Sequence, residues 1–290
     1  GEQQAQALEQ MGYAVTFWPD ERQAVNMDTQ RFEAVICGGL FLTTPIECFS
    51  ALKCIQLTSA GTDRVPLDYC KAHGITVYNA GGVYSAPMAE FVLGGILQLY
   101  KESKFFAENQ AAHWWEKHRG LRELSGKTAC IIGTGSVGSA IARRLRAFDV
   151  QTVGINRSGH PAAEFDQTQP TCRLDDLLPL ADLVICAMPL TAETAGLFDS
   201  VRIAKIKPGA VFVNVARGKV TDQQALAEAL QSGQLSGAVL DVFEEEPLPR
   251  SSPLWDMEQV ILTPHNSFVG EYNGERLFRL ICKNLESFAQ

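Results

Sequence analysis

Apolar and polar positions alternate in short blocks through the middle of the chain. Six runs there consist mainly of aliphatic residues and cysteine, which is typical of strands buried on both faces of a parallel sheet. The runs span residues 128–132, 152–155, 183–187, 211–215, 238–240 and 260–262. The segments between them leave room for the crossover connections that parallel strands require.

Two of the intervening segments have helical periodicity. After the first run, four apolar residues recur on one face of a predicted helix. These residues are Val137, Ile141, Leu145 and Phe148. Residues 222–230 predict a second helix, with Thr221 or Asp222 as its N-cap. Six strands joined by helical crossovers predict a doubly wound parallel sheet, the Rossmann type of α/β domain.

The N-terminal part of the chain repeats the alternation on a smaller scale. Four short runs predict the strands of a second, smaller α/β domain of flavodoxin-like type. They span residues 13–17, 34–37, 54–57 and 75–78. A helical segment at 3–11 precedes them without a strand, so we expect the chain to begin inside its first strand–helix unit. Two more helices are predicted, over 87–106 with Pro87 in the first turn and over 271–288.

Composition limits the class of protein. With 290 residues, 46% apolar and 20% charged, the chain has the composition of a soluble globular protein of about two domains. The longest apolar segment, 91–99, is much shorter than the roughly 20 residues of a membrane span, so no membrane partner is expected. A net charge of −8 argues against nucleic acid as a partner, because phosphates attract basic surfaces.

The eight cysteines contain no C-x-x-C pair. Several lie in apolar stretches, including Cys37, Cys130 and Cys186, and we expect buried, reduced thiols of a cytoplasmic protein. Neither a metal site nor a cysteine nucleophile is expected.

The run at 128–132 leads into a G-x-G-x-x-G pattern formed by Gly133, Gly135 and Gly138. In a strand–turn–helix unit the first glycine permits the tight turn, the second lets backbone approach a pyrophosphate, and the third lets helix and strand pack closely. Ser136 and Val137 would then present N–H groups to the phosphates at the helix N-terminus. The pattern predicts a dinucleotide site, although a glycine-rich turn alone is common.

Three further signals follow later strands, at the sheet edge where ligands of such folds bind. Arg217 follows the run at 211–215 and would hold a carboxylate in a bidentate fork, unless it is an ordinary surface arginine. The acidic segment 241–247 is either functional or a solvated loop. His265 follows the last run and would serve as a proton donor near neutral pH, with an unrelated surface histidine as the alternative.

Taken together, these segments resemble those of the D-isomer-specific 2-hydroxyacid dehydrogenases. The matching segments cover nearly the whole chain and are 59–63, 79–90, 133–138, 214–218, 241–247 and 263–265. The resemblance implies a substrate domain made of residues 1–83 with 268–290, and a Rossmann dinucleotide-binding domain at 84–267. It also implies a homodimer, formed through the helix after Pro87 and the arm around Trp114 and Trp115.

The resemblance implies a catalytic set as well. Arg217 would bind the substrate carboxylate and polarise the reacting carbonyl, and His265 would be the general acid in reduction and the base in oxidation. Glu246, directly before a proline, would hydrogen-bond His265 and favour its charged form. Hydride arriving at C2 leaves negative charge on oxygen, which an imidazolium can neutralise by giving up its proton. The backbone at Ala60, Gly61 and Thr62 would hold the substrate carboxylate.

The choice of dinucleotide depends on the end of the second strand. NAD-selective folds place a carboxylate there, about 20 residues past the glycines, to bond the ribose hydroxyls. Here the strand ends in Asn156, Arg157 and Ser158, which favours the 2′-phosphate of NADP(H), with NAD(H) possible if Arg157 only faces solvent. Further cofactor contacts implied by the resemblance are Ala187, Met188, Pro189, Thr194, Ala216 and Asp241, the last to the nicotinamide carboxamide.

The sequence thus predicts an oxidoreductase that transfers a hydride between nicotinamide and C2 of a 2-oxoacid or D-2-hydroxyacid. A reductase of small 2-oxoacids, such as glyoxylate or hydroxypyruvate, is the main hypothesis. A phosphoglycerate dehydrogenase-like enzyme and a dinucleotide-sensing corepressor are the alternatives, since a fold alone does not fix function.

Overall fold

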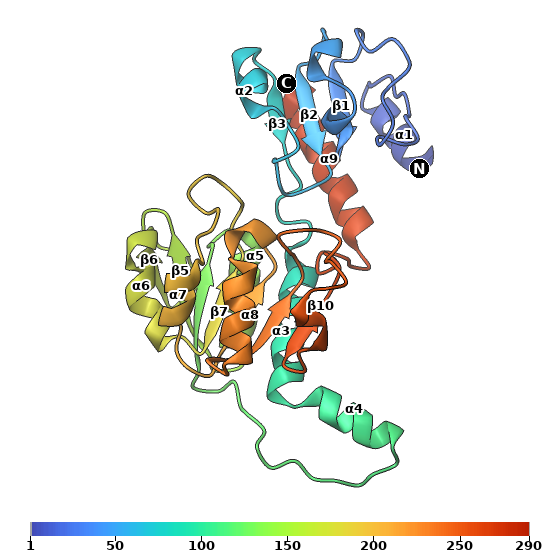
Figure 1. Cartoon of the computed structure of the whole chain (residues 1–290). Coiled ribbons are helices and arrows are strands. Elements are labelled where there is room, and N and C mark those ends of the chain that lie inside the picture. The colour runs from blue at the N-terminus through green and yellow to red at the C-terminus, as the bar shows by residue number, and fades with distance from the viewer. Residues whose placement is uncertain (1, 290) are drawn as a thin grey trace. The chain divides into compact units, whose positions relative to one another are not determined.

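The computed structural model describes residues 2–289 and divides into two units (Figure 1). The larger unit is Ser85–Val269, and the smaller one combines Gly1–Tyr84 with Gly270–Gln290.

The larger unit is built on a sheet of seven parallel strands, in the order β10-β9-β8-β7-β4-β5-β6. The strands are β4 Thr128–Ile132, β5 Gln151–Asn156, β6 Gln167–Pro170, β7 Leu183–Cys186, β8 Ala210–Asn214, β9 Leu235–Leu240 and β10 Val260–Leu262. From β4 the chain builds outward through β5 and β6, then returns to β7 and builds outward on the other side. Because the strands are parallel, all their carboxyl ends lie at one edge, and the order reverses between β4 and β7.

The predicted doubly wound parallel fold is confirmed, but the prediction of six strands missed β6. This strand reads Gln-Thr-Gln-Pro and pairs only with β5 at the sheet edge. An edge strand need not be apolar on both faces, and the polar strand β6 leaves no hydrophobic run in the sequence.

The larger unit contains several helices, most of which pack on the sheet (Figure 1). They are α3 Ser85–Tyr100, α4 Ser103–Ala111, α5 Ser136–Arg146, α6 Leu174–Leu177, α7 Ser200–Lys205 and α8 Gln223–Gln231. Short 3-10 turns lie at Thr171–Arg173, Leu178–Leu180, Gly218–Val220 and Pro253–Asp256. Asp222 is the N-cap of α8, since its carboxylate accepts a hydrogen bond from the Ala225 N–H at 3.0 Å.

The single helix predicted over 87–106 is wrong. The chain leaves the helix after α3, and Glu102 has a φ of +49°, a left-handed conformation that no helix interior allows. The helix α4 then extends away from the sheet of its own unit, as Figure 1 shows. In the arm that follows, Trp114 is 68% exposed and Trp115 is 98% exposed.

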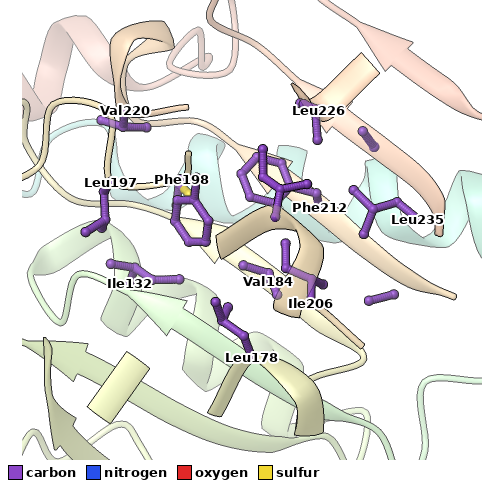
Figure 2. Close-up of a cluster of buried hydrophobic side chains, with 14 of the residues drawn as sticks. Ile132, Leu178, Val184, Leu197, Phe198, Ile206, Phe212, Val220, Leu226 and Leu235 are labelled. Atoms are coloured by element: carbon purple, nitrogen blue, oxygen red, sulfur yellow. The ribbon is translucent and has the colours of Figure 1, made fainter. Parts of the chain in front are cut away.

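Two hydrophobic clusters stabilise the larger unit. One contains Phe198 and Phe212, whose rings meet edge to face at 5.2 Å between centroids (Figure 2). The other lies under α3 and α5. Here α3 approaches the sheet so closely that a Cβ on Gly95 would lie 2.7 Å from a methyl group of Val239, which explains the glycine in a helix interior.

The smaller unit has a three-stranded parallel sheet in the order β1-β2-β3. Its elements are β1 Ala34–Cys37, β2 Cys54–Leu57, β3 Thr76–Tyr78, α1 Glu2–Gln10, α2 Leu67–Ala72 and α9 Asn273–Ala289, with 3-10 turns at Leu40–Leu42 and Ile46–Cys48. The strand predicted at 13–17 is wrong. Phe17 is 81% exposed, and the segment is held instead by the Tyr13 hydroxyl, which donates to the Leu285 carbonyl at 2.9 Å.

All eight cysteines are free thiols. Cys37, Cys130 and Cys186 are buried as predicted, and burial raises the pKa of Cys37 and of Cys130 to about 12. Within residues 2–289, no helix has the length and apolar character to cross a membrane. In the same range, no group of three or more histidine, cysteine or acidic side chains is placed to hold a metal ion.

Candidate active site

The turn after β4 is built by glycines at positions where no side chain fits. Gly133 has a φ of +108°, and a Cβ there would lie 2.6 Å from the carbonyl oxygen of Ala187. A Cβ on Gly138 would lie 1.8 Å from the carbonyl oxygen of Gly133, so the first turn of α5 rests directly on the glycine turn. The first and third glycines are therefore required by packing.

The second glycine serves another purpose. Gly135 is the N-cap of α5, with no side-chain cap, and a Cβ built there meets no atom within 4 Å. The N–H groups of Ser136 and Val137 belong to the first helical turn and have no acceptor within the helix. This open cradle, at the positive end of the helix dipole, fits a dinucleotide pyrophosphate.

Side chains that follow β5 form a turn beside the glycines. The Asn156 amide donates to the Thr134 hydroxyl at 3.1 Å and to the His160 carbonyl at 2.9 Å, and its oxygen accepts from the Gly159 N–H at 2.7 Å. Asn156 thus shapes the turn, while Arg157 and Ser158 are left exposed to solvent. The Ser158 hydroxyl lies 3.2 Å from Nδ1 of His160, a residue that no sequence motif singled out.

The loop after β7 lies on the other side of β4. The Ala187 N–H donates to the Ile132 carbonyl at 2.8 Å, which extends the β4–β7 pairing into the loop, and Met188 is buried. The Thr194 hydroxyl accepts from the Thr191 N–H at 2.7 Å and donates to the Pro189 carbonyl at 2.7 Å. Thr194 therefore closes this loop into a turn, in addition to any contact with a ligand.

The loops after β5 and β7 meet in an ion pair that the sequence did not predict. Nη2 of Arg157 lies 3.8 Å from Oε1 of Glu193, and the two side chains are 86% and 69% exposed. Neither hydrophobic pattern nor spacing signals a contact between exposed side chains on separate loops.

The three predicted catalytic side chains follow neighbouring strands. Arg217 follows β8, Glu246 lies in the segment after β9, and His265 follows β10. The segments after β8 and β9 are in close contact, because a Cβ on Gly218 would lie 1.9 Å from the backbone of Phe243. Glycine at 218 therefore lets the two loops approach each other.

His265 and Glu246 form a direct pair. Nδ1 of His265 lies 2.9 Å from Oε2 of Glu246, and Oε1 of Glu246 accepts from the Phe243 N–H at 3.1 Å. Both paired side chains are about one-third exposed, at 36% and 37%. With Nδ1 held by the carboxylate, Nε2 is the ring nitrogen available to a ligand, and within residues 2–289 it makes no hydrogen bond.

Asp241 fixes the loop that carries His265. It is 1% exposed, and its carboxylate accepts hydrogen bonds from the Thr263 hydroxyl at 2.6 Å and from the N–H groups of Asn266 and Ser267 at 2.7 and 2.9 Å. The Asp241 carbonyl also accepts from the His265 N–H at 2.8 Å. These bonds hold His265 at a φ of +52°, a left-handed conformation that is unfavourable for a histidine.

The backbone around Arg217 is fixed by Asn214 at the end of β8. The Asn214 side chain accepts from the Ala216 N–H at 3.0 Å and donates to the Arg217 carbonyl at 3.2 Å. The guanidinium donates through Nη1 to the Ala216 carbonyl at 2.8 Å, among its other contacts. Ala216 is buried, and Arg217 is partly exposed.

The predicted carboxylate loop belongs to the smaller unit and follows β2. The Ser59 hydroxyl donates to the Gly61 carbonyl at 2.8 Å, and the Asn79 amide donates to the Ala60 carbonyl at 2.9 Å. The N–H groups of Ala60, Gly61 and Thr62 donate to no acceptor in the described part of the chain. Three consecutive free N–H groups suit an anionic ligand.

Comparison with known proteins agrees with this geometry. Residues 93–267 match the family model described as D-isomer specific 2-hydroxyacid dehydrogenase, NAD binding domain. The chain is 34% identical over 280 residues to glyoxylate reductase of Thermofilum pendens, covering 92% of this chain and 81% of that protein. It is 36% identical over 217 residues to D-3-phosphoglycerate dehydrogenase of Mycobacterium leprae, covering 74% of this chain and 40% of that protein.

Solved structures show the same likeness. A D-isomer specific 2-hydroxyacid dehydrogenase family protein from Aeromonas salmonicida superposes with a TM-score of 0.79 at 34% identity, covering 90% of this chain and 83% of that one. A D-isomer specific 2-hydroxyacid dehydrogenase from Xanthobacter autotrophicus, in complex with NADPH, superposes with a TM-score of 0.76 at 29% identity. The match covers 89% of this chain and 81% of that one. D-lactate dehydrogenase from Aquifex aeolicus, complexed with NAD and lactic acid, superposes with a TM-score of 0.76 at 27% identity. The match covers 93% of this chain and 85% of that one.

Proposed function

Since this chain belongs to the D-isomer specific 2-hydroxyacid dehydrogenase family, we propose that it reduces small 2-oxoacids of the glyoxylate or hydroxypyruvate type with NADPH as the preferred donor. Membership makes it an NAD(P)-dependent oxidoreductase that acts between a 2-oxoacid and a D-2-hydroxyacid. The observation that carries the proposal is the His265–Glu246 pair, held at 2.9 Å in the unit that also contains the open glycine cradle.

The chain's residues supply binding and proton transfer. The dinucleotide, when bound, supplies the hydride for C2 of the oxoacid. Nε2 of His265 donates a proton to the oxygen on C2, and Glu246 at Nδ1 orients the ring. Arg217 binds the substrate carboxylate and stabilises charge that develops on the carbonyl oxygen.

The two units have different binding roles in this proposal. We assign the smaller unit to the substrate, with the N–H groups of Ala60, Gly61 and Thr62 as further donors to its carboxylate. The larger unit holds the dinucleotide through two sets of residues. The glycine turn contributes Gly133, Gly135, Ser136, Val137 and Gly138. The surrounding loops contribute Asn156, Arg157, Ser158, Ala187, Met188, Pro189, Thr194, Ala216 and Asp241.

The preference for NADPH rests on the end of β5. No carboxylate directly follows that strand, and the guanidinium of Arg157 is largely exposed there, where it would attract a 2′-phosphate. Solved relatives have been seen with NADPH and with NAD, so both dinucleotides are accepted within the fold.

We also propose a cytoplasmic homodimer. The exposed Trp114 and Trp115 in the arm after α4, with the 38% exposed Phe106 in α4, give this part of the chain apolar surface that suits a second copy of the chain. The eight unpaired thiols suit a reducing compartment.

The test is oxidation of NADPH and of NADH in the presence of glyoxylate, hydroxypyruvate, pyruvate, phenylpyruvate and 3-phosphohydroxypyruvate. We expect the first two acids to react fastest, with kcat/KM at least about tenfold higher for NADPH. Equal or better turnover with NADH would refute the cofactor preference. Preferential use of the phosphorylated acid would favour the phosphoglycerate dehydrogenase alternative, and dinucleotide binding without any turnover would favour a corepressor.

A further inference from the structure

The ion pair between Arg157 and Glu193 joins the two loops whose strands flank β4, the strand that leads into the glycine turn. In the sheet, β5 and β7 lie on either side of β4, so their carboxyl ends are roughly 10 Å apart. Arg157 follows β5 and Glu193 lies in the loop after β7, yet their charged atoms approach to 3.8 Å. The pair therefore brings a carboxylate to the guanidinium proposed above to receive the 2′-phosphate.

Glu193 is held in this position by its own loop. Its Oε2 accepts a hydrogen bond from the Thr191 hydroxyl at 2.7 Å, which leaves Oε1 directed at Arg157. The Thr194 hydroxyl closes the same turn. The hydrogen bond from Thr191, reinforced by the charge of Arg157, lowers the pKa of Glu193, so its carboxylate is charged at neutral pH.

The pair has little structural purpose. Exposed ion pairs contribute little to folding, and both side chains here are largely in water. Exposure also leaves both groups accessible to a ligand. A 2′-phosphate carries nearly two negative charges at neutral pH. It would compete with Glu193 for Arg157 and be repelled by the Glu193 carboxylate, whereas a neutral ribose hydroxyl meets neither obstacle.

We propose that Glu193 is a specificity-determining residue, whose carboxylate occupies Arg157 and limits the affinity of the site for the 2′-phosphate of NADP(H). This inference rests on the proposed function, because it takes the position of the 2′-phosphate from there. In this arrangement, the carboxylate that NAD-selective folds place after the second strand comes instead from the loop after β7. Arg157 favours NADP(H), and Glu193 keeps NAD(H) usable.

The test measures binding of two probes, adenosine 2′,5′-bisphosphate and adenosine 5′-monophosphate, to the full chain by calorimetry. We expect E193Q to raise the affinity ratio in favour of the bisphosphate by about threefold to tenfold, and less so at high salt. E258Q is the matched control. Glu258 is an exposed carboxylate that precedes the outer strand β10, away from the loops after β5 and β7. It should keep the wild-type ratio.

The double variant R157Q/E193Q shows whether the effect passes through Arg157. We expect the ratio to change less between R157Q and R157Q/E193Q than between wild type and E193Q. A ratio in E193Q equal to that in E258Q would overturn the proposal, as would an equal gain in the absence of Arg157.

The experiments distinguish a failure of the role of Glu193 from a failure of the proposed reductase activity. A chain that reduces oxoacids but shows no change in E193Q would refute the role of Glu193 alone. A chain that shows the shift in probe binding but reduces no oxoacid would support Glu193 and refute the reductase.

Discussion

The carboxyl edge of the seven-stranded sheet has two sides that are built differently. The His265 side comprises the segments after β8, β9 and β10, and its polar side chains hydrogen-bond one another. The glycine-turn side comprises the segments after β4, β5 and β7. It offers open space at Gly135, free N–H groups at the start of α5, and charged side chains in solvent.

This difference matches two kinds of recognition. Proton transfer requires an acid held at a defined position and angle, so its side chains are fixed in advance by buried partners such as Asp241. A pyrophosphate is bound through backbone donors, which need only an uncapped helix and room to approach. In the function proposed above, proton transfer would therefore depend on side chains that are already paired, and cofactor binding on space that is left open.

The largest expected effect is on the His265 side. H265Q should lower kcat by about 10²–10⁴-fold, because it removes the ring nitrogen that we propose as the proton donor. Its affinity for NADPH, measured by nicotinamide fluorescence, should stay near that of wild type, since the glycine-turn side is untouched. H73Q is the control, because His73 is an exposed histidine of the smaller unit. Full turnover in H265Q would remove His265 from the reaction.

D241N should have the next largest effect. An amide in place of the carboxylate would set an N–H₂ group against the backbone N–H of Ser267 or Asn266, and this would release the loop that positions His265. A small displacement of the acid is enough to lower kcat by about 10²-fold. T263V, which removes one of the three donors, should give an intermediate loss.

The comparison of kcat with dinucleotide affinity decides how Asp241 acts. We expect D241N to lose more in kcat than in NADPH affinity, as a positioning residue would. D256N, which removes an exposed carboxylate, should match wild type in both. A loss that falls mainly on affinity would place the contribution of Asp241 at the nicotinamide instead.

The smallest of the three effects concerns the glycine-turn side. Gly135 has a φ of −74° and ψ of −166°, which alanine accepts, and its Cβ would meet no neighbour. G135A should therefore keep or slightly raise the free energy of unfolding, by up to about 1 kcal/mol. It should weaken NADPH binding about tenfold, because the methyl group fills the space for the pyrophosphate. In G138A, by contrast, the clash at 1.8 Å should reduce stability itself, and a thermal melt distinguishes the two.

Sequence patterns predicted the elements that are buried on both faces. Every predicted run of the central sheet became a strand, and all of these strands except the partly exposed edge strand β10 are largely buried. The errors lie where burial is one-sided or absent, as in the polar edge strand β6 and the exposed segment around Phe17. The helix break at Glu102 was invisible because one left-handed residue leaves no compositional trace.

The site also contains features that the sequence predicts and a contact that it does not. Glycines in a fixed spacing and a histidine after a strand are local signals, and the structure places His265 against Glu246 as the resemblance implied. The Arg157–Glu193 pair joins residues 36 positions apart in the sequence, on separate loops. Such a contact depends on the strand order, in which β5 and β7 flank β4, and no local pattern encodes that order.

The exposed indoles of this chain have a spectroscopic consequence. Trp114, Trp115 and Trp255 are each more than half exposed, so water-facing indoles should dominate the intrinsic emission of the isolated chain and shift it to the red. Two of the three lie together in the arm after α4. Any process that covers this arm should move the emission to shorter wavelength. Association of the chain can therefore be followed, without a label, from the emission wavelength over a series of protein concentrations. The variant W255F would remove the signal of the exposed indole that lies outside the arm.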